Sequence, residues 1–472
     1  MSEIIETLRA LPGVSVTDTP EDMAGNLIDW RRRFSGKARA VVAPDSTEAV
    51  SAVMRACWDA GVPVLPQGGN TSMCGGSVPD DSGTAIILSL SRMNRIRSID
   101  PEDDSVTVDA GCVLQVVQEA ALDHDRLFPM SLGAEGSCQI GGNIATNAGG
   151  TAALRYGNMR DLVLGIEAVL PDGTIWNGLR TLRKNNSGYD LKHLFIGSEG
   201  TLGIVTGAAL RLFPRPAAEA TTLLFFATAD AALKTAATLR AAFPGELSAL
   251  ELLSRSEQDI VARHFPDRAL AMPEGTGWTL LVEVAGAGTE ADLQDKLMAA
   301  LEAPMEAGDV LDAILASNER QREAIWLPRH SVTEANMHEG MGLTHDIAIP
   351  IGKVPEFLTR ADALLAEKLP DATPVVVGHL GDGNMHYIAM FTREFWAKLD
   401  DPKVFTKDVG HLLNDIAADL GGTFSAEHGI GTMHLPDMAR YKAAPELAMM
   451  HAIKATLDPK GLMNPGRLLP AQ

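Results

Sequence analysis

Three glycine-rich segments in the first half of the chain constrain its fold more than any other sequence feature. They span residues 66–76, 133–150 and 197–206, and they hold few bulky side chains. Glycine lets a backbone approach a ligand closely and leaves amide N–H groups free to point at an anion. Three such segments in one half of the chain predict that this half buries a large, flat, phosphate-bearing cofactor.

The first of these segments has the chemistry of a pyrophosphate cradle. It follows a predicted strand at residues 62–65 and adds the side-chain donors Asn70, Thr71 and Ser72. It matches neither G-x-G-x-x-G nor G-x-x-x-x-G-K-[ST], so a Rossmann fold or a P-loop is not predicted. A flexible surface loop is the alternative interpretation of one such segment, but the presence of three favours a cofactor.

A second group of chemically active residues lies late in the chain, where two histidines flank a Gly-Asp-Gly-Asn turn. Residues 375–377 are typical of a buried strand that ends at His379, and the turn brings His386 back beside it. Glu427 would supply a third ligand, and three protein ligands with an open position are typical of a catalytic metal site. His428 is then free to act as a base. The alternative is a hairpin with two ordinary polar histidines and an unrelated Glu-His pair.

Composition argues against several classes of function. The chain has 472 residues and a formal net charge of −21, which disfavours a nucleic-acid partner and adsorption to anionic lipid. No apolar run approaches the ~18 residues of a membrane span, and the first residues lack the basic and apolar regions of a signal peptide. The four cysteines form no C-x2-C pair, so no zinc ribbon or disulfide framework is predicted. We therefore expect a cytoplasmic protein with no integral membrane segment.

The pattern of predicted elements changes at the prolines of residues 213–216. A helix is predicted near residues 47–62, with Ser46 as its N-terminal signal and Gly61 as its end. Beyond the prolines, between residues 218 and 285, strands alternate with Ala/Leu-rich helices. This alternation indicates an α+β domain with an open antiparallel sheet. Because prolines interrupt regular structure, we expect a domain boundary at this point.

These segments together resemble the FAD-binding segments of the vanillyl-alcohol oxidase/PCMH flavoprotein superfamily. The likeness is carried by residues 66–71, 141–150, 197–203 and 464–466. The metal motif narrows it to the branch of D-lactate dehydrogenase, D-2-hydroxyglutarate dehydrogenase and the glycolate oxidase FAD subunit. The resemblance implies an α+β fold in which a two-part PCMH-type FAD-binding domain holds an inserted α+β substrate (cap) domain built on an antiparallel sheet. The implied parts are an FAD-binding domain (1–216), a substrate domain (217–425) and a C-terminal segment that returns to the flavin (426–472).

The resemblance also implies which residues bind the cofactor. The FAD is expected to be non-covalent, because the first glycine segment has no histidine and Cys74 is its only candidate for a covalent link. The implied FAD-binding residues are Pro66, Gln67, Gly68, Gly69, Asn70, Thr71, Ser72, Gly75, Gly76, Ser131, Gly133, Gly136, Ser137, Gly141, Gly142, Asn143, Thr146, Asn147, Gly149, Gly150, Glu199, Gly200, Gly203, Ile204, Val205 and Asn464.

In this branch a divalent metal, usually zinc or manganese, is bound by the residues that correspond to His379, His386 and Glu427, and His428 takes the role of the base. Arg329 and Thr333 match the residues that hold a substrate carboxylate, and Thr344 and His345 are further candidate substrate-binding residues. Two positions depart from the hydroxyglutarate-type pattern. Thr344 stands where those members usually have lysine, and Ile388 stands where they usually have asparagine. The case for a second, distal substrate carboxylate is therefore weaker.

The resemblance implies an FAD- and metal-dependent dehydrogenase. It would oxidise a D-2-hydroxyacid of the D-lactate or D-2-hydroxyglutarate class to the 2-oxo acid, with hydride transfer to flavin N5. Electron-transfer flavoprotein, a quinone or a cytochrome would then reoxidise the flavin, and a homodimer is compatible with the resemblance. Two alternatives stay open from the sequence. They are a metal-dependent hydrolase without flavin and a flavoprotein electron-transfer subunit.

Overall fold

The computed structural model describes residues 2–471 and divides into two compact units. Unit 1 is made of the chain up to Gly150, the stretch Tyr156–Arg215 and the stretch from Glu427 onward, whereas unit 2 is made of Thr151–Arg155 and Pro216–Ala426. Both units combine helices with sheets in which most neighbouring strands are antiparallel. The expected α+β class is therefore confirmed.

Unit 1 has three sheets within its described residues. Their strand orders are β1-β2-β4-β3, β5-β6-β10-β8-β9 and β11-β7. Strands β2, β4 and β3 run parallel, whereas β1 pairs antiparallel with β2 and the second sheet is antiparallel throughout. The strands are β1 (Val14–Thr17), β2 (Val41–Pro44), β3 (Val64–Gln67), β4 (Ile86–Ser89), β5 (Ile96–Asp100), β6 (Ser105–Asp109), β7 (Arg126–Leu127), β8 (Val163–Val169), β9 (Ile175–Gly178), β10 (Ile204–Arg211) and β11 (Phe213–Pro214).

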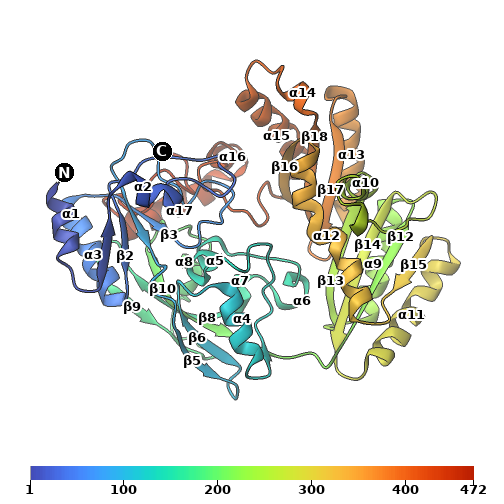
Figure 1. Cartoon of the computed structure of the whole chain (residues 1–472), viewed down its shortest axis with the longest axis horizontal. Coiled ribbons are helices and arrows are strands. Elements are labelled where there is room, and N and C mark those ends of the chain that lie inside the picture. Colours follow the sequence, from blue (N-terminus) through green and yellow to red (C-terminus); the bar gives the residue numbers. More distant parts are fainter. Residues whose placement is uncertain (1, 472) are drawn as a thin grey trace. The chain divides into compact units, whose positions relative to one another are not determined.

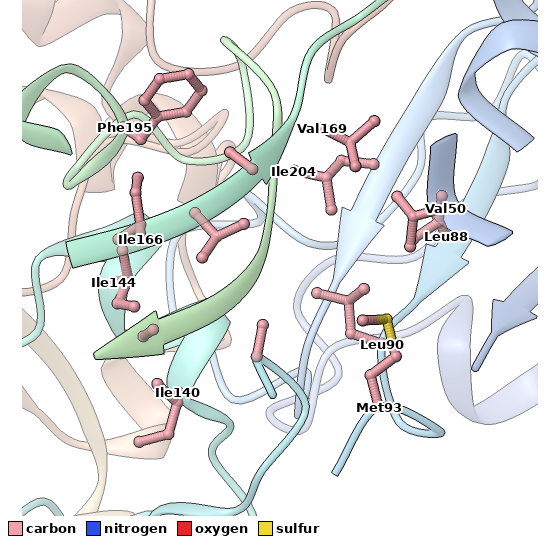
Figure 2. Packing of buried hydrophobic residues seen from close by; sticks show 14 of the residues in the cluster. Val50, Leu88, Leu90, Met93, Ile140, Ile144, Ile166, Val169, Phe195 and Ile204 are labelled. Carbon is pink, nitrogen blue, oxygen red and sulfur yellow. The ribbon is translucent and has the colours of Figure 1, made fainter. Parts of the chain in front are cut away.

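Helices pack against these sheets around one large apolar core, and a smaller apolar cluster of Met23, Val41, Leu65 and Ile87 lies apart from it. Figure 2 shows side chains from α3, α5, β4, β8 and β10 meeting in that core. The helices of unit 1 are α1 (Ser2–Arg9), α2 (Pro20–Met23), the 3₁₀ helix η1 (Ala24–Asn26), α3 (Thr47–Ala60), α4 (Leu114–Leu122), α5 (Ile140–Thr146), α7 (Met159–Leu162), α8 (Lys192–Phe195), α16 (Leu435–Tyr441) and α17 (Ala444–Leu457), while α6 (Ala153–Tyr156) spans the change from unit 2 to unit 1.

Helix α3 forms where the sequence predicts it. The Ser46 side chain accepts a hydrogen bond from the Ala49 N–H, and Gly61 ends the helix in the left-handed conformation with φ 65°. The following strand begins at Val64, two residues later than predicted, because Pro63 has no N–H for the sheet ladder. Strand β3 ends at Gln67, so its last two residues belong to the first glycine segment.

Unit 2 is built on one seven-stranded antiparallel sheet of order β15-β12-β14-β13-β17-β18-β16 (Figure 1). Neighbouring strands pair in antiparallel register across the whole sheet. The strands are β12 (Ala218–Phe226), β13 (Leu247–Ser254), β14 (Trp278–Gly286), β15 (Asp312–Leu315), β16 (Met341–Ala348), β17 (Thr373–His379) and β18 (Asn384–Phe391).

Helices cover both faces of this sheet. Residues of α9, α11, α13 and α15 share one large apolar cluster with one face, and residues of α10 and α12 form smaller clusters with the other face. Within residues 2–471, no helix combines the length and apolar character that a membrane crossing requires. The helices of unit 2 are α9 (Ala229–Ala242), α10 (Arg255–His264), η2 (Pro266–Arg268), α11 (Glu290–Glu306), α12 (Glu319–Glu339), η3 (Ile351–Lys353), α13 (Val354–Lys368), α14 (Arg393–Trp396) and α15 (Pro402–Asp419).

Candidate functional site

The first two glycine segments pack against each other in unit 1, and glycine is what allows the close approach. A Cβ atom at Gly69 would lie 2.0 Å from the Ser137 carbonyl oxygen. At the end of the second segment, a Cβ atom at Gly150 would lie 1.9 Å from the carbonyl oxygen of Ser131, which precedes that segment. No side chain fits at either distance, so the segments can adopt this arrangement only with glycine at these positions.

The third segment and the C-terminal stretch meet at the same place in unit 1. The Asn464 amide group donates hydrogen bonds to the carbonyl oxygens of Gly76 at 3.1 Å and Glu199 at 2.7 Å. The Glu199 carboxylate accepts hydrogen bonds from the N–H groups of Ile430 at 2.7 Å and Gly431 at 2.8 Å. Burial raises the pKa of Glu199, although the two N–H donors oppose the shift. The structure thus brings predicted cofactor residues from three distant segments together.

The side chains of two predicted cofactor residues, Gln67 and Asn70, hold the first glycine segment in its conformation. The Gln67 amide group donates to the carbonyl oxygens of Asn26 at 3.0 Å and Ser77 at 2.8 Å. Asn70 is left-handed, with φ 54°, and its amide group donates to the Ile28 carbonyl oxygen at 2.8 Å. These side-chain hydrogen bonds hold the loop in place.

The remaining predicted cofactor residues lie on the same three segments and their flanks. Ile204 and Val205 are buried and begin β10, and Gly203 precedes them. The others are Pro66, Gly68, Thr71, Ser72, Gly75, Gly133, Gly136, Gly141, Gly142, Asn143, Thr146, Asn147, Gly149 and Gly200.

Two observations in unit 1 fit a bound FAD. The side-chain oxygens Oε1 of Gln139 and Oδ1 of Asn464 are buried and accept no hydrogen bond from residues 2–471. A buried acceptor without a donor destabilises the fold, so such atoms commonly mark a place where a ligand or water donates. Gly133 and Gly142 also have no neighbouring atom within 4 Å of a Cβ position, which leaves their backbone open to a ligand. Hydroxyl and N–H donors and phosphate oxygens, all present on FAD, match this set of groups.

The two histidines of the metal motif lie side by side on the β17–β18 hairpin of unit 2. In the register of the hairpin His379 lies opposite Asn384 and His386 lies opposite Val377, so both imidazoles share one face of the sheet. Their ring centroids are 5.4 Å apart, and a nitrogen of each ring lies within 4.8 Å of the other. Two imidazole nitrogens this close suit a single metal ion.

A buried carboxylate on the neighbouring strand links this hairpin to helix α12. Glu251 of β13 is 1% exposed. Its carboxylate accepts a hydrogen bond from His379 Nδ1 at 2.7 Å and one from Arg329 Nε at 2.8 Å. Burial alone would raise the pKa of Glu251, but its electrostatic interactions and hydrogen bonds with His379 and Arg329 lower it well below its usual range. The predicted substrate residue Arg329 therefore lies next to the predicted ligand His379.

Asp346 of β16 contacts both the β17–β18 hairpin and the last residue of unit 2. It accepts a hydrogen bond from the Asn384 amide group at 3.0 Å and lies 3.6 Å from His386 Nδ1. Its carboxylate also accepts from the N–H of Ala426 at 3.1 Å. Ala426 is the last residue of unit 2, so Glu427 follows it directly in the chain. Within unit 1, Glu427 Oε1 lies 3.3 Å from a Cβ position at Gly149 of the second glycine segment.

The register of β16 and β18 determines on which face of the sheet the residues near the predicted substrate site lie. Thr344 and Ile388 lie directly opposite each other on β16 and β18, on the sheet face that carries His386. Thr333 lies one helical turn after Arg329 on α12. His345 is on the opposite face, because side chains alternate along a strand. Its Nε2 atom lies 3.8 Å from a Cβ position at Gly410 of α15, so the structure does not bring it to the other candidates.

Sequence reasoning did not identify Glu251 and Asp346 as site residues. Glu251 had one detectable signal, since it is the single charged residue in the otherwise apolar and small segment Leu247–Ser254. Asp346 follows the predicted His345 in the sequence and has no local signal of its own. A hollow of about 590 Å³ in unit 1, bordered by Arg160, Arg183 and Arg211, contains none of the predicted site residues.

Comparisons with known proteins show the family to which the chain belongs. Residues 215–468 match the family "FAD linked oxidases, C-terminal domain", and residues 38–178 match the family "FAD binding domain". The chain is 38% identical to the D-2-hydroxyglutarate dehydrogenase, mitochondrial, of Bos taurus over 98% of this chain and 82% of that protein. It is 36% identical to the D-2-hydroxyglutarate dehydrogenase of Xanthomonas citri pv. viticola over 98% of this chain and 96% of that protein.

The fold is also similar to a solved flavoenzyme. The structure of p-cresol methylhydroxylase with substrate bound has a TM-score of 0.76 and 17% sequence identity to this chain, covering 99% of this chain and 97% of that one. The PCMH-type fold expected from the sequence is therefore confirmed. The chain belongs to the FAD-linked oxidase family, and it is an FAD-binding dehydrogenase of the D-2-hydroxyglutarate and D-lactate dehydrogenase type.

Proposed function

We propose that this protein oxidises a D-2-hydroxyacid at C2 to the 2-oxo acid, using FAD and one divalent metal ion, zinc or manganese. The single observation that carries the proposal is the group of Arg329, Glu251 and His379 on one sheet face of unit 2, with His386 beside it. A guanidinium beside two metal-ligating imidazoles is suited to a small acid that binds through a carboxylate and a neighbouring hydroxyl.

We propose His379, His386 and Glu427 as the metal ligands. Chain connectivity supports Glu427, because Ala426 donates to Asp346 at 3.1 Å and Asp346 lies 3.6 Å from His386. Glu427 is the next residue after Ala426, and consecutive Cα atoms are about 3.8 Å apart. Imidazole nitrogens and a carboxylate oxygen are ligands that zinc accepts, and three of them leave a position for substrate.

Each protein group then has a defined task in the reaction. Arg329 holds the substrate carboxylate, with Thr333 one turn along the helix, and His428 takes the proton of the 2-hydroxyl. The metal would supply Lewis-acid polarisation of that hydroxyl, and FAD would supply the hydride acceptor at N5. The pair Thr344 and Ile388 forms a neutral wall beside His386, which favours an uncharged distal part of the substrate.

We propose that FAD is bound without a covalent link, by the three glycine segments and Asn464 of unit 1. The two buried acceptors on Gln139 and Asn464 and the open backbone of Gly142 support this. Acid precipitation should release the yellow flavin into the supernatant, because no covalent bond retains it. Colour that stays in the pellet would contradict the proposal.

We further propose that electron-transfer flavoprotein, a quinone or a cytochrome reoxidises the flavin, in a cytoplasmic protein. The family assignment weighs against a flavin-free hydrolase, because the sequence matches an FAD-binding domain. The presence of Arg329 and both histidines at one place weighs against a flavoprotein subunit that only relays electrons.

The decisive experiment is a screen of D- and L-2-hydroxyacids with an artificial electron acceptor, before and after removal of the metal. We expect turnover of D-enantiomers, loss of that turnover on chelation, and an unchanged flavin spectrum, because the histidine ligands lie in unit 2 and the flavin segments in unit 1. Equal rates on D- and L-lactate would refute the stereochemistry, and full activity in metal-free protein would refute the metal.

A further inference from the structure

We propose that Glu251 is a positioning residue that fixes His379 and Arg329 relative to each other. This inference rests on the proposed function, in which His379 holds a metal and Arg329 holds the substrate carboxylate. Glu251 accepts one hydrogen bond from each of them, at 2.7 Å and 2.8 Å, through its two different carboxylate oxygens. One rigid side chain thus connects the metal site to the substrate anchor.

The contact with His379 determines which ring nitrogen carries the proton. A carboxylate oxygen at 2.7 Å from Nδ1 requires the proton on Nδ1, so the lone pair of a neutral ring is on Nε2. A metal-ligating histidine commonly donates its other N–H to a carboxylate, which orients the ring and makes it a better ligand. The exposed fraction of the Glu251 side chain is 1% and that of His379 is 8%, so water does not compete effectively for this contact.

The contact with Arg329 selects which edge of the guanidinium faces the substrate. Glu251 takes the Nε–H, which leaves the edge formed by the two Nη atoms for a bidentate pair with a carboxylate. Arg329 extends from α12, whereas Glu251 and His379 lie on adjacent strands of the sheet. Glu251 therefore sets the position of a helix-borne anchor against a strand-borne ligand, which helix packing alone would not define at the level of single atoms.

The chain supplies a matched control on the next strand. Glu283 of β14 is a half-buried carboxylate that contacts α12, because it accepts a hydrogen bond from Trp326 Nε1 at 2.9 Å. It contacts none of the proposed metal or substrate residues through a hydrogen bond. Glu283→Gln makes the same change of carboxylate to amide beside α12 as Glu251→Gln, at a residue that has no hydrogen bond to the proposed metal or substrate residues.

The test compares Glu251→Gln with Glu283→Gln by three measurements. Nitrogen-15 NMR of labelled histidine in metal-free protein reports the His379 tautomer, competition titration reports the zinc affinity, and steady-state kinetics at saturating zinc report kcat and KM for D-lactate and D-2-hydroxyglutarate. The two contacts use different carboxylate oxygens, and a glutamine amide has an NH2 donor in place of one of them, so one contact must break. For Glu251→Gln we expect a loss of the pure Nδ1–H tautomer, a zinc affinity weaker by about 10–100-fold, and a raised KM that saturating zinc does not restore.

The control decides what those changes mean. Glu283→Gln should keep the tautomer, the zinc affinity and the KM within twofold of the parent protein. Similar changes in both variants would show that Glu251 only ties α12 to the sheet, and no change in Glu251→Gln would overturn the proposal outright. Because the tautomer is read without metal or substrate, it decides the role of Glu251 even if the protein turns over no D-2-hydroxyacid, which would refute the proposed function instead. Glu251→Asp serves as a second variant if Glu251→Gln does not fold.

Discussion

At the scale of single residues, Glu257 carries a buried carboxyl group with little to stabilise its charge. It is fully buried, its Oε2 accepts a hydrogen bond from the Asn336 amide group at 2.9 Å, and its Oε1 has no partner among the described residues. Burial raises its pKa to about 7, against smaller opposing effects from Asn336 and the charge of Arg329. The group is therefore largely protonated below neutral pH.

This shift predicts how stability depends on pH. The folded-state pKa of Glu257 lies above the unfolded value, so folded protein keeps a proton that the unfolded chain releases between about pH 4.5 and 7. Its contribution to stability is consequently present at low pH and falls as the pH rises through that window, by roughly 1.4 kcal/mol per pKa unit. Glu257→Gln removes the ionisation. Its thermal midpoint should be close to the parent value at pH 5 and a few degrees above it at pH 8, as measured by calorimetry. Glu306→Gln, at an exposed position, should show no such trend.

His428 belongs to the same scale, as the proposed base. His428→Ala should lower kcat by roughly 10²–10⁴-fold, which is the usual contribution of a positioned proton acceptor. The metal content, measured by elemental analysis, should hardly change, because His428 is not one of the proposed ligands. A near-normal kcat would mean that another group takes the proton.

Residue-scale prediction succeeded where the signal was local and failed where it was distant. His379 and His386 flank one glycine-rich turn, so the sequence alone indicates that they meet. Glu251 hydrogen-bonds to a residue 128 positions away, and no local pattern encodes that contact. His345 illustrates a second difficulty, since its sheet face depends on a register that neighbouring residues do not specify.

At the scale of elements, the β17–β18 hairpin depends on one glycine. Gly383 has φ +83°, and a Cβ atom there would lie 2.1 Å from the Ile349 carbonyl oxygen. Gly383→Ala should therefore destabilise unit 2 by at least about 2 kcal/mol and weaken zinc binding, because the turn that places both histidines must deform. Calorimetry and zinc titration would measure this, and Gly352→Ala, at a position with open space around it, is the control. Unchanged zinc affinity in Gly383→Ala would show that the turn is not what places the ligands.

Helices and strands could likewise be predicted where the signal was local, and not where it depended on distant residues. Helix α3 could be predicted because Ser46 and Gly61 mark both of its ends. Strand β3 begins two residues after the apolar run that predicts it, because Pro63 has no N–H for the sheet ladder. The order of the seven strands in unit 2 places β13 beside β17 across more than one hundred residues. Such pairing arises from packing of the whole sheet, so periodicity along the sequence does not predict it.

At the scale of the whole molecule, the net charge of −21 bears on the choice of substrate. A dicarboxylate carries twice the charge of a monocarboxylate into this field, and the wall formed by Thr344 and Ile388 supplies no cation to compensate. A buried carboxylate without a charged partner is strongly unfavourable. We therefore expect D-lactate or medium-sized apolar D-2-hydroxyacids to be used at least as well as D-2-hydroxyglutarate, although the relatives compared above act on the latter according to their names.

The last prediction distinguishes the effect of a charge at residue 344 from the effect of the protein's net charge. Thr344→Lys should raise kcat/KM for D-2-hydroxyglutarate relative to D-lactate, because it places a cation on the sheet face that carries His386. Raising the ionic strength from about 10 to 150 mM should improve the dicarboxylate more than the monocarboxylate in the parent protein, because screening weakens long-range repulsion. In the uncharged variant Thr344→Val, the change in relative kcat/KM on adding salt should be smaller than the change that Thr344→Lys produces. If the parent protein already prefers D-2-hydroxyglutarate more than tenfold over every monocarboxylate, and Thr344→Lys changes little, then a cation other than residue 344 holds the distal carboxylate and the neutral-wall interpretation is wrong.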